Sequence, residues 1–177
     1  VASSGNHTLP GDAEYVLFPA SLDNVIAVGA SNYAGDARAT YSNYGPELDV
    51  VAPVGSGTGD GGVIATTLSC FTTDCTESSD LSLFPANGSY IRGWGTSFAA
   101  PQVAAQVALM RSIGITDKIL ISNTIKSSTD DIIPSNFDNL TGWGKININK
   151  SISTPYSVVG YLAKGTKWHD WFAPYDE

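Results

Sequence analysis

The chain has 177 residues, which is enough for one domain with a buried core, and its formal net charge is −8. Apolar residues make up 42% and charged residues 15% of the sequence, a composition typical of a compact domain and not of a disordered chain. The negative charge and the absence of any lysine or arginine run argue against nucleic acid or an anionic membrane as a partner. No apolar stretch of the sequence is long enough to cross a bilayer.

Strands are expected in the first half of the chain. Residues 25–31 and 47–53 are short apolar runs with β-branched residues, which are typical of buried strands in a parallel sheet. Residues 37–43 alternate weakly and predict a more exposed strand, and residues 62–68 follow a glycine-rich turn and predict a fourth. Residues 69–90 are polar and are expected to be irregular.

Two helices are expected in the second half. Residues 97–114 are rich in alanine and larger apolar residues on nearly every side, which predicts a helix buried all round. Thr116 and Asp117 open a second helix with one apolar face. That face is formed by Ile119, Leu120, Thr124 and Ile125. Residues 142–149 are expected to be a short extended piece. Early strands followed by helices indicate the α/β class.

The segment GWGTSFAAP (93–101) places a serine where a glycine-rich turn enters the first helix. Gly93 and Gly95 allow the backbone a positive φ or a close approach. Ser97 could cap the helix by accepting a hydrogen bond from a backbone N–H, and spacing alone favours this interpretation. Alternatively, Ser97 is a nucleophile placed where the helix dipole and free N–H groups stabilise developing negative charge.

Resemblance to the subtilisin-like serine peptidases, the subtilases, favours the nucleophile. GTSFAAPQV (95–103) is similar to the family's serine motif, Gly-Thr-Ser-Met-Ala-Ala-Pro-His-Val, at seven of nine positions, with Phe98 and Gln102 as the two departures. Ser97 matches the nucleophile of that motif. VASSGN at the start of the chain resembles the family's Val-Ala-Ala-Ala-Gly-Asn segment, in which Asn6 matches the side-chain donor of the oxyanion hole.

Further segments resemble subtilase segments in the family's order. They are FPASLDNVIAVGAS (18–31), YSNYGPELDVVAP (41–53) and GWGKININ (142–149). The resemblance implies a subtilisin-like three-layer sandwich with a mainly parallel sheet, of which this chain supplies the C-terminal portion. We accordingly expect the C-terminal portion of a peptidase domain over residues 1–153 and an aromatic-rich tail over residues 154–177.

The resemblance also implies roles for individual residues. Ser97 would attack the scissile carbonyl to form an acyl-enzyme, while Asn6 and the backbone N–H of Ser97 would hold the oxyanion. The implied substrate pocket is lined by Ala2, Ser3, Ser4, Gly5, Leu17, Gly95 and Thr96. Family members that accept large residues often have glycine at the position of Leu17, so Leu17 predicts a preference for small or medium apolar residues. The alternative is that Leu17 packs in the core.

The catalytic Asp and His are expected to lie outside this chain. In subtilases both precede the segment that VASSGN resembles, and neither His7 nor His169 matches a family His motif. We expect an N-terminal fragment of the same precursor to supply both residues, as a separate chain held non-covalently, with peptides or proteins as substrates. Two alternatives remain open. One is a catalytically inactive, subtilase-like binding module, and the other is a subtilase-like transpeptidase in which an amine resolves the acyl-enzyme.

The cysteines and the first residues bear on the compartment. Cys70 and Cys75 could form a local disulfide or remain free thiols; we favour the disulfide, which an oxidising compartment sustains. A chain that begins VASSGN is expected after removal of an upstream segment, and the expected location is extracellular. The subtilase scheme requires no cofactor. Residues 57–62 or the neighbourhood of Asp23 could bind structural calcium, with a plain turn as the alternative.

Overall fold

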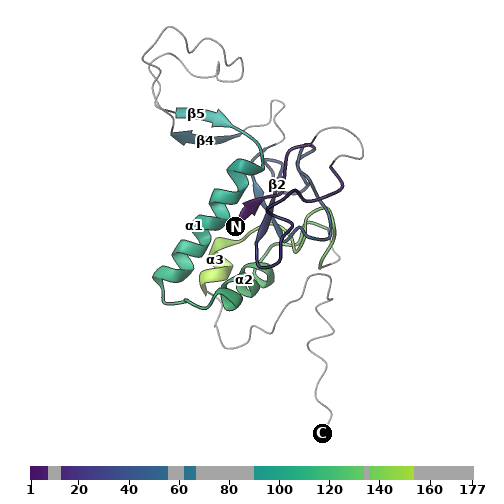
Figure 1. Ribbon diagram of the computed structural model, residues 1–177. Coiled ribbons are helices and arrows are strands. Elements are labelled where there is room, and N and C mark those ends of the chain that lie inside the picture. Colours follow the sequence, from purple (N-terminus) through teal and green to yellow (C-terminus); the bar gives the residue numbers. More distant parts are fainter. Residues whose placement is uncertain (8–12, 56–61, 67–89, 134–135, 154–177) are drawn as a thin grey trace.

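The computed structural model describes residues 1–7, 13–55, 62–66, 90–133 and 136–153. Within these residues the chain forms a three-stranded sheet, a two-stranded sheet and three helices (Figure 1). The expected tail and the loop that carries both cysteines lie outside the described residues.

The three-stranded sheet is parallel. β1 (Ala2–Ser3), β2 (Ala27–Ser31) and β3 (Val50–Pro53) lie side by side in that order. Every residue of β2 is buried. The apolar runs at 25–31 and 47–53 therefore supply β2 and β3, and the predicted α/β class with a parallel sheet is confirmed.

Residues 37–43 do not form the exposed strand that their alternation predicts. They make two isolated bridges, between Arg38 and Ser31 and between Ser42 and Asn6, with a turn between them. The guanidinium of Arg38 donates to three backbone oxygens of the turn, and the Ser42 hydroxyl accepts from the N–H of Ala30 at 2.9 Å. Hydrogen bonds from side chains thus take the place of the backbone pairing that a strand would make.

An antiparallel hairpin precedes the first helix. β4 (Val63–Thr66) pairs with β5 (Tyr90–Gly93), with Val63 opposite Gly93. β4 confirms the strand predicted at 62–68, whereas β5 begins at the end of the stretch expected to be irregular. In Figure 1 the hairpin projects from the end of the molecule at which the first helix starts.

The helices are α1 (Thr96–Ser112), α2 (Lys118–Ser127) and α3 (Ile148–Ser153). α1 and α2 confirm the two predicted helices. The side chain of Asp117 caps α2 by accepting hydrogen bonds from two backbone N–H groups of its first turn, at 2.9 and 2.8 Å. The extended piece expected at 142–149 is shorter, because the Asn147 side chain accepts from Lys150 N at 2.9 Å and α3 begins there.

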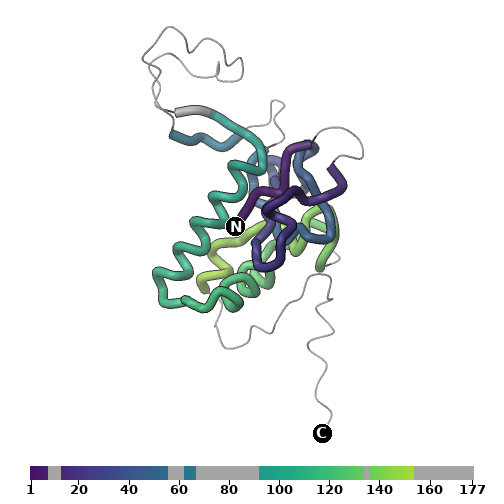
Figure 2. The backbone as a smooth tube through the Cα atoms, viewed as in Figure 1, coloured from purple at the N-terminus to yellow at the C-terminus, as the bar shows by residue number. Residues whose placement is uncertain are grey.

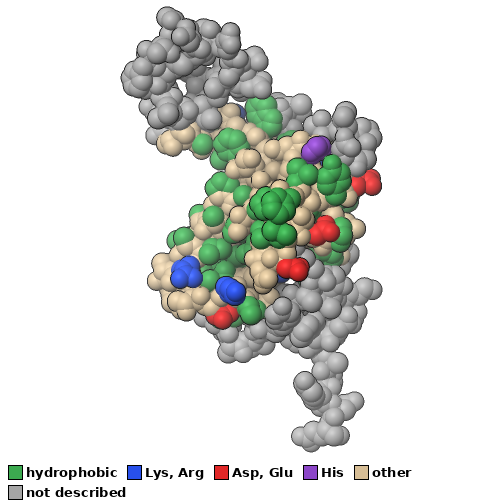
Figure 3. Space-filling view, viewed as in Figure 1, with side chains coloured by type: hydrophobic (Ala, Val, Ile, Leu, Met, Phe, Trp, Pro, Cys, Tyr) green, Lys and Arg blue, Asp and Glu red, His purple; other side chains and the backbone are tan. Residues whose placement is uncertain are grey.

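α1 is not buried all round, which corrects the prediction from its apolar composition. Its inward stripe follows helical spacing and consists of Thr96, Ala99, Val103, Gln106 and Met110. Apolar residues on other sides are exposed, and these include Ala104, Ala105, Ala108 and Leu109. Apolar side chains are visible along α1 in the space-filling view (Figure 3). Among the described residues, only one side of α1 has a sheet to pack against.

The apolar face of α2 is also rotated from the predicted one. Ile119 is 46% exposed, whereas Ile121 and Ile125 are buried together with Thr124. Residues 121, 124 and 125 share one helical face, which packs toward α1 and the sheet.

The sheet separates two apolar clusters. The larger one joins alternate strand residues to the helices and includes Val28, Ala30, Val50, Ala52, Val103 and Ile125. The smaller one lies on the other face and consists of Val16, Ala20, Ala27, Leu48 and Val51. Figure 2 shows the chain from residue 13 to residue 55 folded against the helices. This packing places the first turn of α1 beside the residues that follow β1.

Candidate active site

Ser97 lies in the first turn of α1 and is exposed. The N-cap residue is Gly95, at φ 120° and ψ 155°, and no side chain caps the helix. A φ of this kind favours glycine, because a Cβ would be strained there. The helix-cap explanation of Ser97 therefore does not hold, since Ser97 sits two residues inside the helix end and its side chain is open to solvent.

The first backbone amides of the turn have different partners. Gly95 N donates to the phenol oxygen of Tyr41 at 3.0 Å, and Thr96 N donates to Oδ1 of Asn6 at 2.8 Å. Within the described parts of the chain, the amide of Ser97 has no hydrogen-bond acceptor. An unoccupied N–H at a helix N-terminus is suited to receive a negatively charged oxygen.

The side chain of Asn6 has a fixed orientation. Its Oδ1 accepts from both the backbone N and the hydroxyl of Thr96, at 2.8 and 2.9 Å. The Nδ2 group is thereby the end left to donate elsewhere, and Asn6 is exposed. A Cβ at Gly95 would stand 3.3 Å from Asn6 Nδ2, so the glycine leaves room for the amide to lie against the turn.

Leu17 lies against the segment that carries Asn6. Its backbone N donates to Ser4 O at 2.9 Å, and its Cδ1 would be 2.6 Å from a Cβ at Gly5. Leu17 is half-buried and belongs to neither apolar cluster, whereas its neighbour Val16 is in the core. The structure thus brings Leu17 and Gly5 together.

Two of the predicted pocket residues turn their side chains inward. Ser4 is fully buried and its hydroxyl donates to Asn43 O at 2.9 Å. Thr96 is fully buried, and its hydroxyl is committed to Asn6 and accepts weakly from Gly5 N at 3.3 Å. These two side chains hold neighbouring segments of the site in place and do not face solvent. Ala2 and Ser3 form β1, at the edge of the three-stranded sheet.

His7 makes its contacts away from Ser97. The ring of His7 packs against Tyr15, with the ring centroids 6.0 Å apart, and its backbone N donates to Asn43. Among the described residues, no hydrogen bond joins the Ser97 hydroxyl to a histidine or a carboxylate. His169 lies outside them.

Sequence reasoning missed Tyr41 and Asn43, which are both buried. Asn43 Oδ1 accepts from His7 N at 2.8 Å, and Asn43 Nδ2 donates to Tyr15 O at 2.9 Å. The one available signal was the place of both residues at the start of the family-like segment 41–53.

Arg38 stabilises the turn that contains these residues. Burial lowers the pKa of Arg38, and its guanidinium carbon lies 4.5 Å from the centre of the Tyr44 ring. Tyr44 in turn donates to Glu14 at 2.9 Å, and this hydrogen bond raises the pKa of the Tyr44 phenol. The Tyr44 phenol stays neutral at neutral pH, since its pKa moves upward from 10.0.

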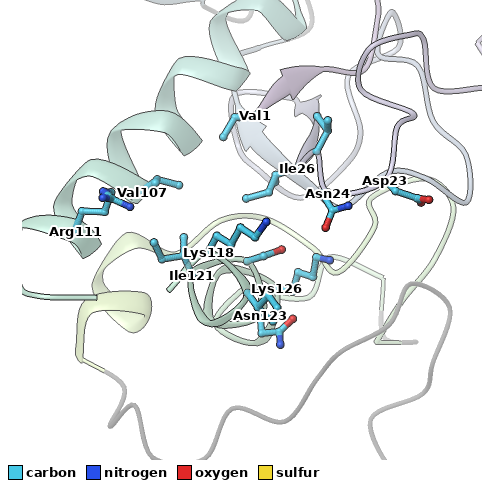
Figure 4. A pocket seen from close by; sticks show the side chains of 13 residues that line it. Val1, Asp23, Asn24, Ile26, Val107, Arg111, Lys118, Ile121, Asn123 and Lys126 are labelled. Carbon is cyan, nitrogen blue, oxygen red and sulfur yellow. The ribbon is translucent and has the colours of Figure 1, made fainter. Parts of the chain in front are cut away.

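A separate pocket of about 580 Å³ opens near the other end of α1 (Figure 4). Its lining includes Val107, Arg111, Lys118, Lys126, Ile26 and Val1. The lining residues of α1 lie at least ten positions beyond Ser97, about 15 Å along the helix. This pocket is therefore not part of the candidate active site.

The calcium and disulfide predictions are not tested by the described residues. Cys70, Cys75 and residues 57–61 lie outside them, and Asp23 is exposed at the rim of the separate pocket. In the described ranges, no three acidic, histidine or cysteine side chains gather to hold a metal ion. Nor does any helix there have the length and apolar character needed to cross a membrane.

The structure thus brings together an exposed serine at a helix N-terminus, an amide without an acceptor among the described residues, and an asparagine of fixed orientation. Residues 1–144 match the sequence profile of the subtilase family of serine peptidases, and the chain belongs to this family.

Curated relatives agree with this assignment. An extracellular protease of Xanthomonas campestris is 35% identical over 136 residues, which cover 76% of this chain and 20% of the relative. Alkaline elastase YaB of a Bacillus species is 33% identical over 155 residues, covering 87% of this chain and 32% of the relative. The chain therefore spans a third or less of the length of these two proteins.

Solved structures share the fold. Fervidolysin from Fervidobacterium pennivorans, a keratinolytic enzyme related to subtilisin, superposes with a TM-score of 0.68 at 23% identity, over 87% of this chain and 22% of the other. A protease from Pseudoalteromonas arctica gives a TM-score of 0.66 at 27% identity, over 86% of this chain and 41% of the other. The predicted subtilisin-like fold is thus confirmed.

Proposed function

We propose that this chain is the nucleophile-bearing portion of a secreted serine endopeptidase that works through an acyl-enzyme on Ser97. The observation that carries the proposal is the first turn of α1, where Asn6 is fixed by Thr96 beside the unoccupied amide of Ser97. The name of the Xanthomonas relative, an extracellular protease, supports secretion.

In this scheme Ser97 Oγ forms a bond to the carbonyl carbon of the scissile peptide while its proton passes to a histidine. The carbonyl oxygen becomes an oxyanion that accepts from Asn6 Nδ2 and Ser97 N. The C–N bond then breaks as the histidine protonates the leaving amine. Water attacks the ester in the same way, which releases the acid and restores the serine.

We propose that an N-terminal segment of the same precursor supplies the histidine and its aspartate. Two features support a further segment packed on this chain. Apolar residues are exposed on α1 and at its C-cap, with Leu109 at 47% and Ile113 at 52%. β1 also has only β2 as a neighbour within the described sheet, so its other edge could pair with another strand.

The proposal predicts that the full protein cleaves peptides and that Ser97→Ala abolishes cleavage, because no other group replaces the nucleophile. Mass spectrometry of the products of an unlabelled peptide is the measurement. Ser112→Ala, which removes another exposed serine hydroxyl from the far end of α1, is the matched control and should retain full activity.

The products of the reaction distinguish a peptidase from a transpeptidase and from a binding module. Free carboxyl and amino ends show hydrolysis, whereas ligated or cyclised peptides show a transpeptidase. A folded full protein that retains the histidine and aspartate but yields no product would contradict the peptidase proposal and leave a binding module.

We further propose that Leu17 limits the size of the residue accepted at the cleavage site. Leu17 lies against Gly5 and is only half-buried, which leaves part of its side chain available to narrow the pocket. Leu17→Gly should raise kcat/KM for a phenylalanine substrate relative to an alanine substrate by about tenfold or more. Leu22→Gly, an exposed leucine in the same loop, is the control. An unchanged phenylalanine-to-alanine ratio in Leu17→Gly would refute the role of Leu17.

A further inference from the structure

The two donors of the proposed oxyanion hole come from distant parts of the chain. Asn6 follows β1, whereas Ser97 starts α1, and their relative position must be fixed to a few tenths of an ångström for both to reach one oxygen. One short segment, Tyr41–Asn43, contacts both sides. We propose that Tyr41 is a positioning residue of the oxyanion hole, whose phenol fixes Gly95 and thereby the direction of the Ser97 amide. This inference rests on the proposed peptidase function.

Tyr41 is held at a fixed point of the fold. It is 7% exposed, and its phenol donates to Gly55 O at 2.8 Å while it accepts from Gly95 N at 3.0 Å. Gly55 N in turn donates to Ser31 O, the last residue of β2, at 3.1 Å. A chain of hydrogen bonds thus ties the turn before Ser97 to the carboxyl end of a core strand.

The same segment holds Asn6 from both sides. Asn43 N donates to Gly5 O at 3.0 Å, and Asn43 Oδ1 accepts from His7 N at 2.8 Å. Asn43 is fully buried, so these bonds are shielded from water. The segment Tyr41–Asn43 therefore sets the position of one donor through Gly5 and His7 and that of the other through Gly95.

The orientation of Gly95 depends on its hydrogen bond to the Tyr41 phenol. It is buried, has a left-handed φ of 120° and carries no side chain of its own to pack. Thr96 N and Ser97 N follow it directly along the chain. If the phenol is removed, Gly95 N loses its partner and the turn can rotate, so the Ser97 amide no longer points where the oxyanion forms.

The test compares two variants of the full protein that each remove one phenol hydroxyl, one inside the segment Tyr41–Asn43 and one directly after it. Tyr41→Phe deletes the hydrogen bonds that join Gly95 N to Gly55 O through the phenol, whereas Tyr44→Phe deletes only the exposed bond to Glu14. The concentration of active sites is determined by titration with a fluorophosphonate, and each rate is divided by it. All rates are measured well below the melting temperature of each variant.

We expect Tyr41→Phe to lower kcat about tenfold with KM changed less than about twofold, because the oxyanion exists only in the transition state. Its affinity for a peptide boronic acid, which forms a tetrahedral anion on the serine, should fall by a similar factor. Affinity for a non-covalent product peptide should stay constant, and Tyr44→Phe should match the unmodified protein in all three measurements.

Unchanged kcat and boronate affinity in Tyr41→Phe, with only a lower melting temperature, would overturn the inference and leave Tyr41 as a core residue. Failure of the proposed function looks different. In that case the unmodified protein itself would neither hydrolyse peptides nor react with the fluorophosphonate, and the role inferred for Tyr41 would fall with it.

Discussion

Replacing Asn6 with alanine is expected to lower kcat by about 10²–10³-fold with little change in KM, the range found when the asparagine donor is removed from a subtilisin oxyanion hole. The geometry gives the reason. Thr96 occupies Oδ1 of Asn6 with two hydrogen bonds, so Nδ2 is the group left to stabilise the oxyanion. That donor acts in the transition state and not in the bound substrate, so kcat carries the loss.

Alanine also leaves the buried Thr96 N–H and hydroxyl without their acceptor, which could disturb the turn for a different reason. Asn6→Asp separates the two effects, because a carboxylate still accepts from Thr96 but cannot donate. We expect the aspartate variant to be at least as impaired as the alanine variant while keeping a near-normal melting temperature. Substantial turnover in Asn6→Asp would show that Asn6 is not an oxyanion donor.

Replacing Asp49 with alanine is expected to destabilise the fold by about 3–5 kcal/mol, because it leaves a buried cation without its partner. Asp49 Oδ1 lies 3.3 Å from Lys126 Nζ, and the two side chains are only 1% and 9% exposed. Asp49 Oδ2 also accepts from Ala27 N at 2.7 Å, at the first residue of β2. The carboxylate thus joins α2 to the start of the central strand.

A surface ion pair is the control for this prediction. Lys150 Nζ lies 2.6 Å from Asp130, but the two side chains are 54% and 41% exposed. Lys150→Met should therefore change stability by less than about 1 kcal/mol. The measurement is the urea midpoint of unfolding, compared between variants whose unfolding free energy has the same dependence on urea concentration. A similar small shift for Asp49→Ala would contradict the structural role of the Asp49–Lys126 pair.

Local patterns of the sequence predicted the elements that frame the site. The apolar runs around Val28 and Val50 indicated buried parallel strands, since both faces of such strands are covered. Asp117 before an apolar periodic stretch indicated the start of α2, and its side chain caps that helix. The motif around Ser97 marked the turn into α1.

Features that depend on distant partners were not predictable in this way. The alanine-rich composition of α1 does not reveal which side meets the sheet, and Leu109 is exposed although its residue type suggests burial. The roles of Tyr41 and Asn43 depend on backbone groups at Gly95 and His7, far away in sequence. No periodicity in residues 37–43 encodes those contacts, and the strand predicted there is in fact a turn.

The inward orientation of Ser4 and Thr96 has the same origin. Their membership in family-like motifs suggested contact with substrate, but each hydroxyl bonds to a neighbouring segment of the protein. A motif match locates the site and does not say which of its side chains face outward.

Whether Ser97 is an activated nucleophile can be measured by reaction of the full protein with a fluorophosphonate followed by intact-mass spectrometry. The reagent forms a stable bond only with a serine whose proton is removed by a base. We expect one added phosphonyl group on the chain that contains Ser97, and none on Ser97→Ala. A folded protein that retains its histidine and aspartate yet gains no mass would show that Ser97 is not an activated nucleophile.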